Sequence, residues 1–249
     1  MLQRGFFDFI VYCMIIYTDS HCHITANLNK STPVLGRICN ACQESQWEQL
    51  TSLANDKNFV CLGIHPWFVN DLSAGWDKKL YTLLVKNPKL MIGEIGLDKY
   101  HPWPDIQETV FITQMELAYN LNRPVHIHCV GAWERFLHIL KELGTRVPLL
   151  TVVHSFNGDV AKIPDFIKKY NMYFSFSGKQ LERFDSGTAK RIQAVPNNRI
   201  LIESDTETES KELSELNKAL VGISKTKEIS QDVLSEQIYQ NFQRVTQND

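Results

Sequence analysis

The chain has 249 residues, of which 43% are hydrophobic and 22% charged, as in an ordinary globular protein. This length is enough for one α/β barrel or two smaller domains with a sizeable core. The 26 Lys and Arg stand against 28 Asp and Glu, a net charge of −2, which excludes a strongly basic chain. Any nucleic-acid partner must therefore be held by local positive charge.

The N-terminal stretch "MLQRGFFDFIVYCMIIY" has an early Arg and an apolar run, as a signal peptide does. Asp8 interrupts the run, no small-residue cleavage site follows, and the run is shorter than the roughly 20 apolar residues that cross a bilayer. We expect residues 1–13 to be an N-terminal extension and 14–249 to form the domain. We also expect an intracellular protein without a membrane segment, in the cytoplasm, with the nucleus as a second compartment to test.

Eight apolar runs rich in β-branched and aromatic residues predict strands. They cover 14–21, 34–41, 59–65, 90–97, 124–130, 149–156, 172–178 and 199–205. Helices are predicted between them, at 44–57, 77–87, 105–121, 133–143, 159–170 and 188–195. This alternation indicates βαβ units on a parallel sheet, and eight strands in this length predict a single (β/α)₈ TIM-type barrel.

A doubly wound open sheet is the alternative fold, but no Gly-rich phosphate loop follows the first strand. The link "ITANLNKSTP" after His23 is short and polar, so we expect a shortened first helix. The stretch "ESDTETESKE" at 203–212 predicts an acidic, polar loop.

Six cysteines are spread over the first 129 residues, mostly inside apolar runs, which indicates free buried thiols rather than disulfides. Cys39 and Cys42 form a C-x-x-C, but no second pair or matched histidines lie nearby. A zinc knuckle or a redox role is therefore not expected.

The stretch "TDSHCHI" at 18–24 places two histidines one residue apart on a predicted strand. Side chains alternate along a strand, so His21 and His23 share a face and Cys22 takes the other. Two buried imidazoles repel when protonated, whereas a divalent cation satisfies both of them. This pair indicates a metal site or, alternatively, two solvated histidines at a strand end.

The positions of the other polar residues favour the metal site, because six of the eight histidines end predicted strands. Barrel enzymes build their sites at these carboxyl ends. The polar residues at or near these ends are His21, His23, His65, Glu94, Asp98, His126, His128, His154 and Asp205.

Four of these histidines and two carboxylates are enough for two divalent cations. Glu94, on a central strand, has two oxygens to share between the ions. His21, His23 and Asp205 would complete one site, and His128 and His154 the other. Mg, Mn and Zn all remain open as the metal.

The blocks "DSHCHI", "GIHPW", "GEIGLDKY", "QMELAYNLNRPVHIHC", "HSFNG" and "ILIESD" resemble, in order, the signature blocks of the TatD family of metal-dependent deoxyribonucleases. That family belongs to the amidohydrolase-like metallohydrolase superfamily. The resemblance runs from Tyr17 to Asp205 and continues weakly to "NFQRV". It implies a barrel, a two-metal centre and hydrolysis of DNA phosphodiesters. It also implies the six ligands His21, His23, Glu94, His128, His154 and Asp205.

Two departures from that family concern the substrate. Val130 and Gly131 stand where the family usually has a basic and an acidic residue, and "TETES" replaces an apolar, Pro-containing turn. Loss of an Arg and gain of Glu207 and Glu209 disfavour phosphate at the site, so weak binding of long DNA is expected.

The remaining candidates have less certain roles. His65 and Tyr100 are interpreted as substrate-binding residues, while His126 is expected to support a ligand or fill the core rather than bind metal. Glu94 and Asp205 are the predicted catalytic residues, with Asp205 also accepting the proton of the attacking water.

These patterns predict an enzyme, a metal-dependent hydrolase, and the resemblance implies that it acts on ester bonds as a deoxyribonuclease. Two alternatives stay open. One is a barrel hydrolase for another small substrate such as an amide or lactone. The other is a catalytically weak protein-interaction module that binds a partner through the acidic loop.

Overall fold

The structure is a computed structural model that describes residues 15–25, 32–183 and 185–247. Eight parallel strands form one sheet, and each strand pairs with its neighbours in chain order. The strands are β1 Tyr17–Cys22, β2 Val34–Asn40, β3 Asn58–Leu62, β4 Met91–Asp98, β5 Val125–Val130, β6 Thr151–Val153, β7 Met172–Ser177 and β8 Ile200–Glu203.

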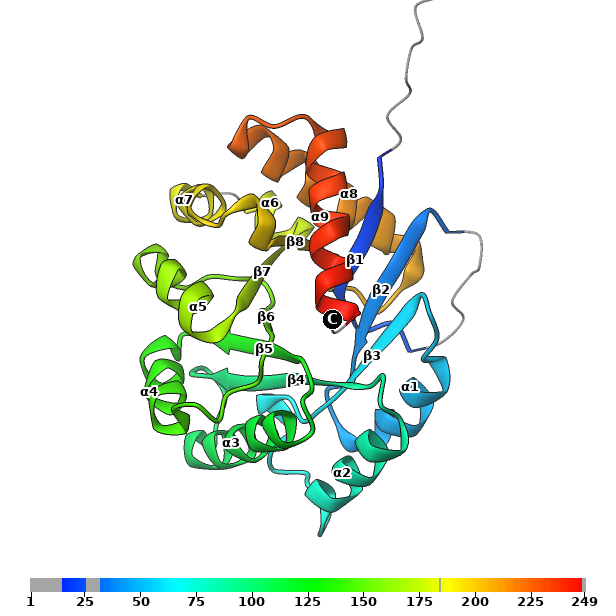
Figure 1. The fold of residues 1–249 in the computed structure, drawn as a ribbon, viewed down its shortest axis with the longest axis vertical. Helices are drawn as coiled ribbons and strands as arrows, with labels where there is room; N and C mark the ends of the chain where they lie inside the picture. The colour runs from blue at the N-terminus through cyan, green and yellow to red at the C-terminus, as the bar shows by residue number, and fades with distance from the viewer. Residues whose placement is uncertain (1–14, 26–31, 184, 248–249) are drawn as a thin grey trace, which may run out of the picture.

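The two ends of this order, β1 and β8, meet and close the sheet into a barrel (Figure 1). The His23 N–H donates to the carbonyl of Thr206 at 2.9 Å, and the Asp205 N–H donates to the carbonyl of His21 at 3.0 Å. The buried Asp19 carboxylate joins the same strands, since it accepts the Ser204 N–H at 3.0 Å and the Ser204 hydroxyl at 2.5 Å. The predicted single (β/α)₈ barrel is confirmed.

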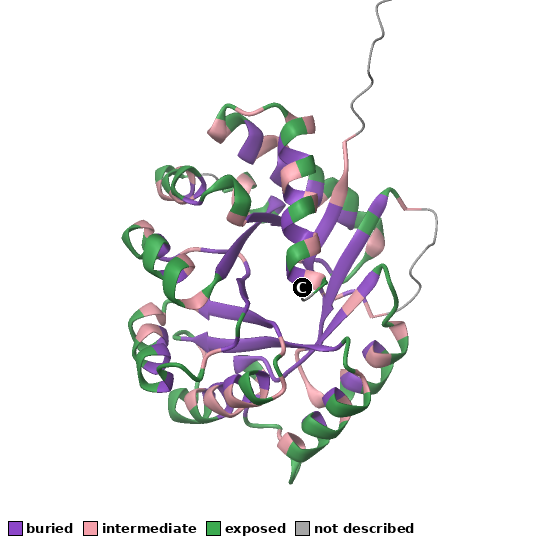
Figure 2. Ribbon diagram, in the orientation of Figure 1, coloured by how far each residue is buried: buried purple, intermediate pink, exposed green. Residues whose placement is uncertain are grey.

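Helices surround the barrel and present their outer faces to solvent (Figure 2). The α-helices are α1 Trp47–Leu53, α2 Trp76–Lys86, α3 Pro104–Asn120, α4 Trp133–Leu143, α5 Ile163–Tyr170, α6 Gly178–Glu182, α7 Ser186–Ala194, α8 Glu209–Lys227 and α9 Gln231–Thr246. Short 3₁₀ helices are η1 Glu44–Gln46, η2 Pro66–Phe68, η3 Val160–Lys162 and η4 Asn197–Arg199. The larger core lies between strands and helices and includes Trp47, Phe111 and Phe136, all fully buried.

A second apolar cluster fills the barrel interior at the amino ends of the strands. Ile38, Cys61 and Met91 belong to it, and Phe242 of α9 packs against them. Gly36 makes room for this contact, because a Cβ there would lie 2.8 Å from the Phe242 ring. Apolar side chains thus fill the barrel interior toward the amino ends of the strands, and the larger cavity opens at the carboxyl ends.

The structure corrects several predicted strand ends. His65, His154 and Asp205 lie after their strands rather than within them. Pro66 turns the chain into η2 directly after His65. Ser155 and Asp205 adopt left-handed backbone, with φ of 43° and 47°, which ends extended structure there.

The predicted acidic loop at 203–212 is wrong in its second half. Glu209 is the first residue of α8, where the helix dipole favours acidic side chains. Glu209 and Glu212 both contact the Arg37 guanidinium of β2 rather than facing solvent as a loop would. The sequence reasoning also missed α6, α8 and α9.

The remaining predictions concern the N-terminal extension, the link after His23, the cysteines and the absence of a membrane segment. The 1–13 extension lies outside the described residues, and so does most of the link expected to hold a shortened first helix. The five described cysteines are free, and Cys22 and Cys39 lie 3.7 Å apart across β1 and β2. Within the described ranges, no helix combines the length and apolar character needed to cross a membrane.

Candidate metal centre

A cavity of about 1060 Å³ opens at the carboxyl ends of the strands. Parallel strands all present these ends to one side, so residues far apart in the sequence converge there. Its lining includes the predicted residues His23, His65, Glu94, His128, His154 and Asp205. The sixth predicted ligand, His21, lies fully buried directly beneath them.

Glu94 lies at the centre of this group, on β4, with 2% of its surface exposed. Its Oε2 lies 3.3 Å from the Nε2 atoms of both His21 and His23. Its Oε1 lies 2.9 Å from His128 Nδ1 and 2.7 Å from His154 Nε2. Each oxygen of the Glu94 carboxylate therefore lies next to a different pair of histidines.

The first pair is joined by Asp205. The Nε2 atoms of His21 and His23 are 3.3 Å apart, and Asp205 Oδ1 lies 3.7 Å from His23 Nε2. His23 Nδ1 is 3.1 Å from the Asn40 carbonyl, which can only accept, so Nδ1 carries the proton. The Nε2 lone pair of His23 therefore faces Glu94 and Asp205.

The second pair is supported by carboxylates from behind. His128 Nδ1 and His154 Nε2 are 3.1 Å apart and both face Glu94. On the far side of each ring, His128 Nε2 lies 3.4 Å from Asp98 Oδ2 and His154 Nδ1 lies 3.6 Å from Glu203 Oε1. A carboxylate behind a histidine fixes its ring and its tautomer when the other nitrogen binds metal.

Glu203 is a residue that the sequence reasoning missed. It is fully buried at the end of β8 and accepts the N–H and hydroxyl of Ser155, at 2.9 and 2.6 Å, and the hydroxyl of Ser175. The signal was present in "ILIESD", because a charged residue inside an apolar strand needs a buried partner.

The buried carboxylates of this group favour positive charge beside them, as the pKa shifts of the neighbouring residues indicate. Burial raises the pKa of Glu94, but His154, His65 and His21 outweigh it and hold that pKa well below its usual range. Burial and His154 lower the pKa of His21. Burial also lowers the pKa of His154, but Glu94 and Glu203 more than reverse this and raise it well above its usual value. An ionised carboxylate among imidazoles is a donor set for divalent cations.

Four overlapping groups of donor atoms around this cavity could hold an ion. They are His21–His23–Asp205, His21–Glu94–His154, His65–Glu94–His128 and His23–Cys42–Glu94. All six predicted ligands are among them. His65 and Cys42 were not predicted as donors, although His65 Nε2 lies 3.4 Å from Glu94 Oε1 and Cys42 Sγ lies 3.5 Å from His23 Nδ1.

The other two candidates lie elsewhere. Tyr100 is 78% exposed and is not among the residues that line the cavity. Its ring packs over Gly131, where a Cβ would lie 3.1 Å from it. Gly131 also has φ of 65°, so the acidic residue that the family usually has at this position would be strained. His126 is fully buried and stacks 6.2 Å from His21, and within the described part of the chain neither of its ring nitrogens is hydrogen-bonded.

The mouth of the cavity carries charges of both signs. Lys179, Lys211 and Lys218 line it together with Glu182, Glu207 and Glu215. Lys218 pairs with Glu182 and, at 2.8 Å, with Glu215. Lys179 Nζ donates to the Asp205 carbonyl at 2.7 Å and to its Oδ2 at 3.1 Å. A lysine from α6 therefore lies beside Asp205, one of the predicted ligands, where the sequence had predicted a shortage of cations.

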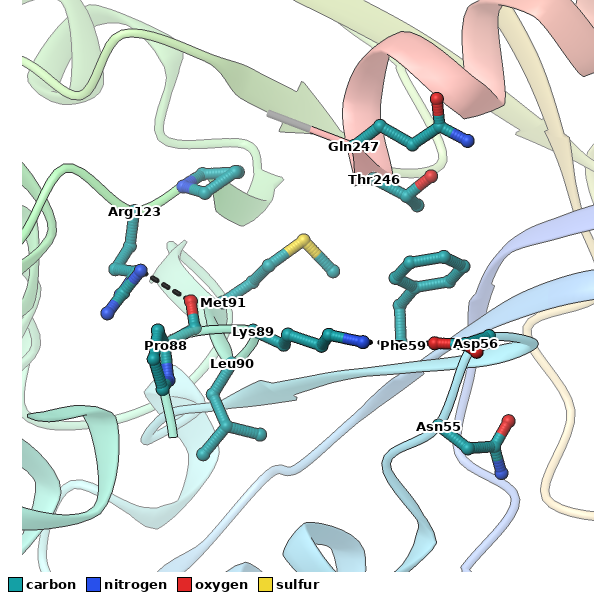
Figure 3. A pocket seen from close by; sticks show the side chains of 11 residues that line it. Asn55, Asp56, Phe59, Pro88, Lys89, Leu90, Met91, Arg123, Thr246 and Gln247 are labelled. Carbon is teal, nitrogen blue, oxygen red and sulfur yellow. Dashed lines mark hydrogen bonds and ion pairs between the residues drawn. The ribbon is translucent and has the colours of Figure 1, made fainter. Parts of the chain in front are cut away.

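A smaller cavity, of about 450 Å³, lies at the opposite end of the barrel (Figure 3). Its cations are already bonded, since Lys89 pairs with Asp56 at 2.9 Å and Arg123 donates to the Pro88 carbonyl. None of the predicted site residues lines it.

The sequence is similar to several known proteins. The chain is 34% identical to the Bacillus subtilis protein named uncharacterized metal-dependent hydrolase YabD, over 59% of this chain and 58% of that protein. It is 28% identical to the Escherichia coli 3'-5' ssDNA/RNA exonuclease TatD, over 66% of this chain and 63% of that protein. These two matches span less than two thirds of the relatives' length. The Danio rerio protein tatdn3 is 28% identical over 92% of this chain and 96% of its own.

Solved structures share the fold. A TatD family hydrolase from Entamoeba histolytica superposes with a TM-score of 0.77 at 18% identity, over 94% of this chain and 99% of that one. The Escherichia coli TatD homologue YJJV gives a TM-score of 0.77 at 19% identity, over 93% and 98%. The family model described as TatD related DNase matches residues 18–247, nearly the whole described barrel. The chain belongs to the TatD related DNase family.

Proposed function

We propose that this protein is a metal-dependent hydrolase that cleaves phosphodiester bonds of DNA. The observation that carries the proposal is the position of the Glu94 carboxylate between two pairs of histidines. Its Oε2 faces His21 and His23, and its Oε1 faces His128 and His154. A carboxylate shared in this way is typical of hydrolases with two metal ions about 3.5–4 Å apart.

The donor set would hold two divalent cations, with Mg, Mn and Zn as candidates. His21, His23, Asp205 and Glu94 would hold one ion, and His128, His154 and Glu94 the other. When bound, such ions lower the pKa of water toward about 7 and stabilise the negative charge on the attacking and leaving oxygens.

The protein's own residues supply the remaining functions. Asp205 lies at the cavity wall with 26% of its side chain exposed, so its carboxylate is accessible as an acceptor for the proton of the attacking water. The Lys179 ammonium holds Asp205 through its carbonyl and its Oδ2 and thereby orients this carboxylate. Lys179 also adds positive charge where a substrate phosphate would approach.

The relatives named as nucleases support DNA as the substrate class. Lys179 and Lys211 would attract phosphate, while Glu207 would oppose a long polyanion. A short or single-stranded substrate therefore suits the site better than an extended duplex.

The test is hydrolysis of an end-labelled single-stranded oligonucleotide by the purified protein. We expect cleavage that a chelator abolishes and that Mg²⁺, Mn²⁺ or Zn²⁺ restores, and no cleavage by Glu94→Gln under any of these conditions. Turnover of amides or lactones alone would instead show a barrel hydrolase for another substrate. No turnover with any metal would refute the proposal.

A further inference from the structure

Trp67 lines the metal cavity but contributes no metal donor. It is the middle residue of η2, directly after His65 and Pro66 at the end of β3. Half of its surface, 49%, is exposed. The exposed half of the indole is therefore open to a ligand in the cavity.

The indole is nevertheless held in one orientation. Its Nε1–H donates to Asp98 Oδ2 at 2.8 Å. The His101 ring stacks on it, with centroids 4.4 Å apart and planes 18° apart. The His65 ring meets it edge-on at 5.0 Å. A ring fixed in advance by three contacts loses little conformational freedom when a ligand binds.

The indole is also close to the proposed chemistry. Its centroid is 6.3 Å from the ring of His128, whose Nδ1 faces Glu94. Asp98 connects the two, because the oxygen that accepts the Trp67 N–H also lies 3.4 Å from His128 Nε2. The exposed part of the indole would therefore be within reach of a base next to a phosphate held by the proposed ligands.

A second cavity lies next to Trp67, on the side away from the proposed metal centre. The lining of this second cavity, of about 640 Å³, includes Asp98, Lys99 and His101, and also Arg135, which is paired with Glu108. Trp67 lines the first cavity and His101 the second, so the stacked pair separates the two. A strand that leaves the metal centre over this pair would pass Lys99, whose charge suits a following phosphate.

We propose that Trp67 is a base-stacking residue, which holds the nucleobase adjacent to the phosphodiester that is cleaved. This inference rests on the proposed nuclease function and adds the recognition of an unpaired base. Every base has a π face, so this contact selects single-stranded nucleic acid without selecting a sequence. A paired base inside a duplex cannot reach the indole in this way.

The experiment compares two oligonucleotides that differ only in one base. One is a short single strand, and the other carries an abasic tetrahydrofuran residue next to the cleaved phosphate. The specificity constant kcat/KM is measured for the metal-loaded wild type, Trp67→Ala, Trp67→Phe and Trp103→Ala. Trp103 is the matched control, because it is 53% exposed and lines neither cavity.

We expect Trp67→Ala to lower kcat/KM for the complete strand by roughly 5- to 150-fold, the range of base stacking on an aromatic side chain. The abasic strand should be cleaved equally by Trp67→Ala and the wild type. Trp67→Phe should retain most of the preference for the complete strand, and Trp103→Ala should behave as wild type.

Three results would overturn the inference. Equal losses on both strands in Trp67→Ala would mean that Trp67 acts through Asp98 and His128 rather than on a base. Equal cleavage of both strands by the wild type would mean that no base is bound there. Cleavage of neither strand by the wild type would refute the proposed function, and the inference with it.

Discussion

Replacing Glu212 by Gln should destabilise the barrel strongly, because Glu212 neutralises a buried arginine. Glu212 is 1% exposed and Arg37 is 4% exposed. Glu212 Oε1 accepts from Arg37 Nε at 2.7 Å and Oε2 accepts from Nη2 at 2.6 Å. Breaking a buried ion pair by removing one partner costs about 3–5 kcal/mol. Gln keeps one acceptor, so we expect the lower end, about 3 kcal/mol, which is about 6–12 °C in melting temperature at this chain length.

The assay is thermal unfolding followed by circular dichroism in metal-free buffer. Glu209→Gln is the matched control, because Glu209 lies one turn earlier on α8, is 20% exposed and contacts the same Nη2 at the longer distance of 3.4 Å. Its loss should cost at most about 1 kcal/mol. Equal shifts for the two variants, or none for Glu212→Gln, would refute the reasoning.

Three further predictions concern the site. Glu94→Gln should abolish hydrolysis but still unfold cooperatively, because the core is built from apolar strand and helix faces; a variant without a cooperative melt would contradict this. His128→Ala should lose bound metal, as measured by elemental analysis. His126→Ala should keep most of the metal, because neither nitrogen of the His126 ring is within hydrogen-bonding range of Glu94. Equal metal losses in the two variants would show that His126 is needed for metal binding as much as His128. Glu207→Gln should lower KM for single-stranded DNA at low salt. The difference in KM should disappear as salt rises, because salt screens charges that lie more than about 8–10 Å apart. An unchanged KM at every salt concentration would place Glu207 away from the substrate path.

Much of the fold follows from local patterns. The strands are continuous apolar runs, and their alternation with helical segments favours βαβ units and a barrel. The sequence could also predict that the histidines lie together in one site, because parallel strands bring their carboxyl ends to one side of the barrel. His21 and His128 lie 107 residues apart in the sequence, yet both face Glu94.

The rest depends on contacts that no local pattern reveals. Glu209 and Glu212 looked like part of a solvated acidic loop because their partner, Arg37, lies 175 residues before Glu212. Glu203 could be recognised only as an unexplained charge until Ser155 and His154 were seen beside it. Tyr100 follows the strand that carries Glu94, but its ring lies over Gly131 and does not line the cavity.

The central claim is that Glu94 joins two metal sites, and counting bound ions tests it most directly. Calorimetric titration of the metal-free protein with Mn²⁺ gives the number of ions per chain and their affinities, without reference to any substrate. The geometry predicts two ions per chain for the wild type and weakened binding of both in Glu94→Gln, because each oxygen of Glu94 faces a different histidine pair. A single ion in the wild type, or two ions bound with unchanged affinity in Glu94→Gln, would contradict the account.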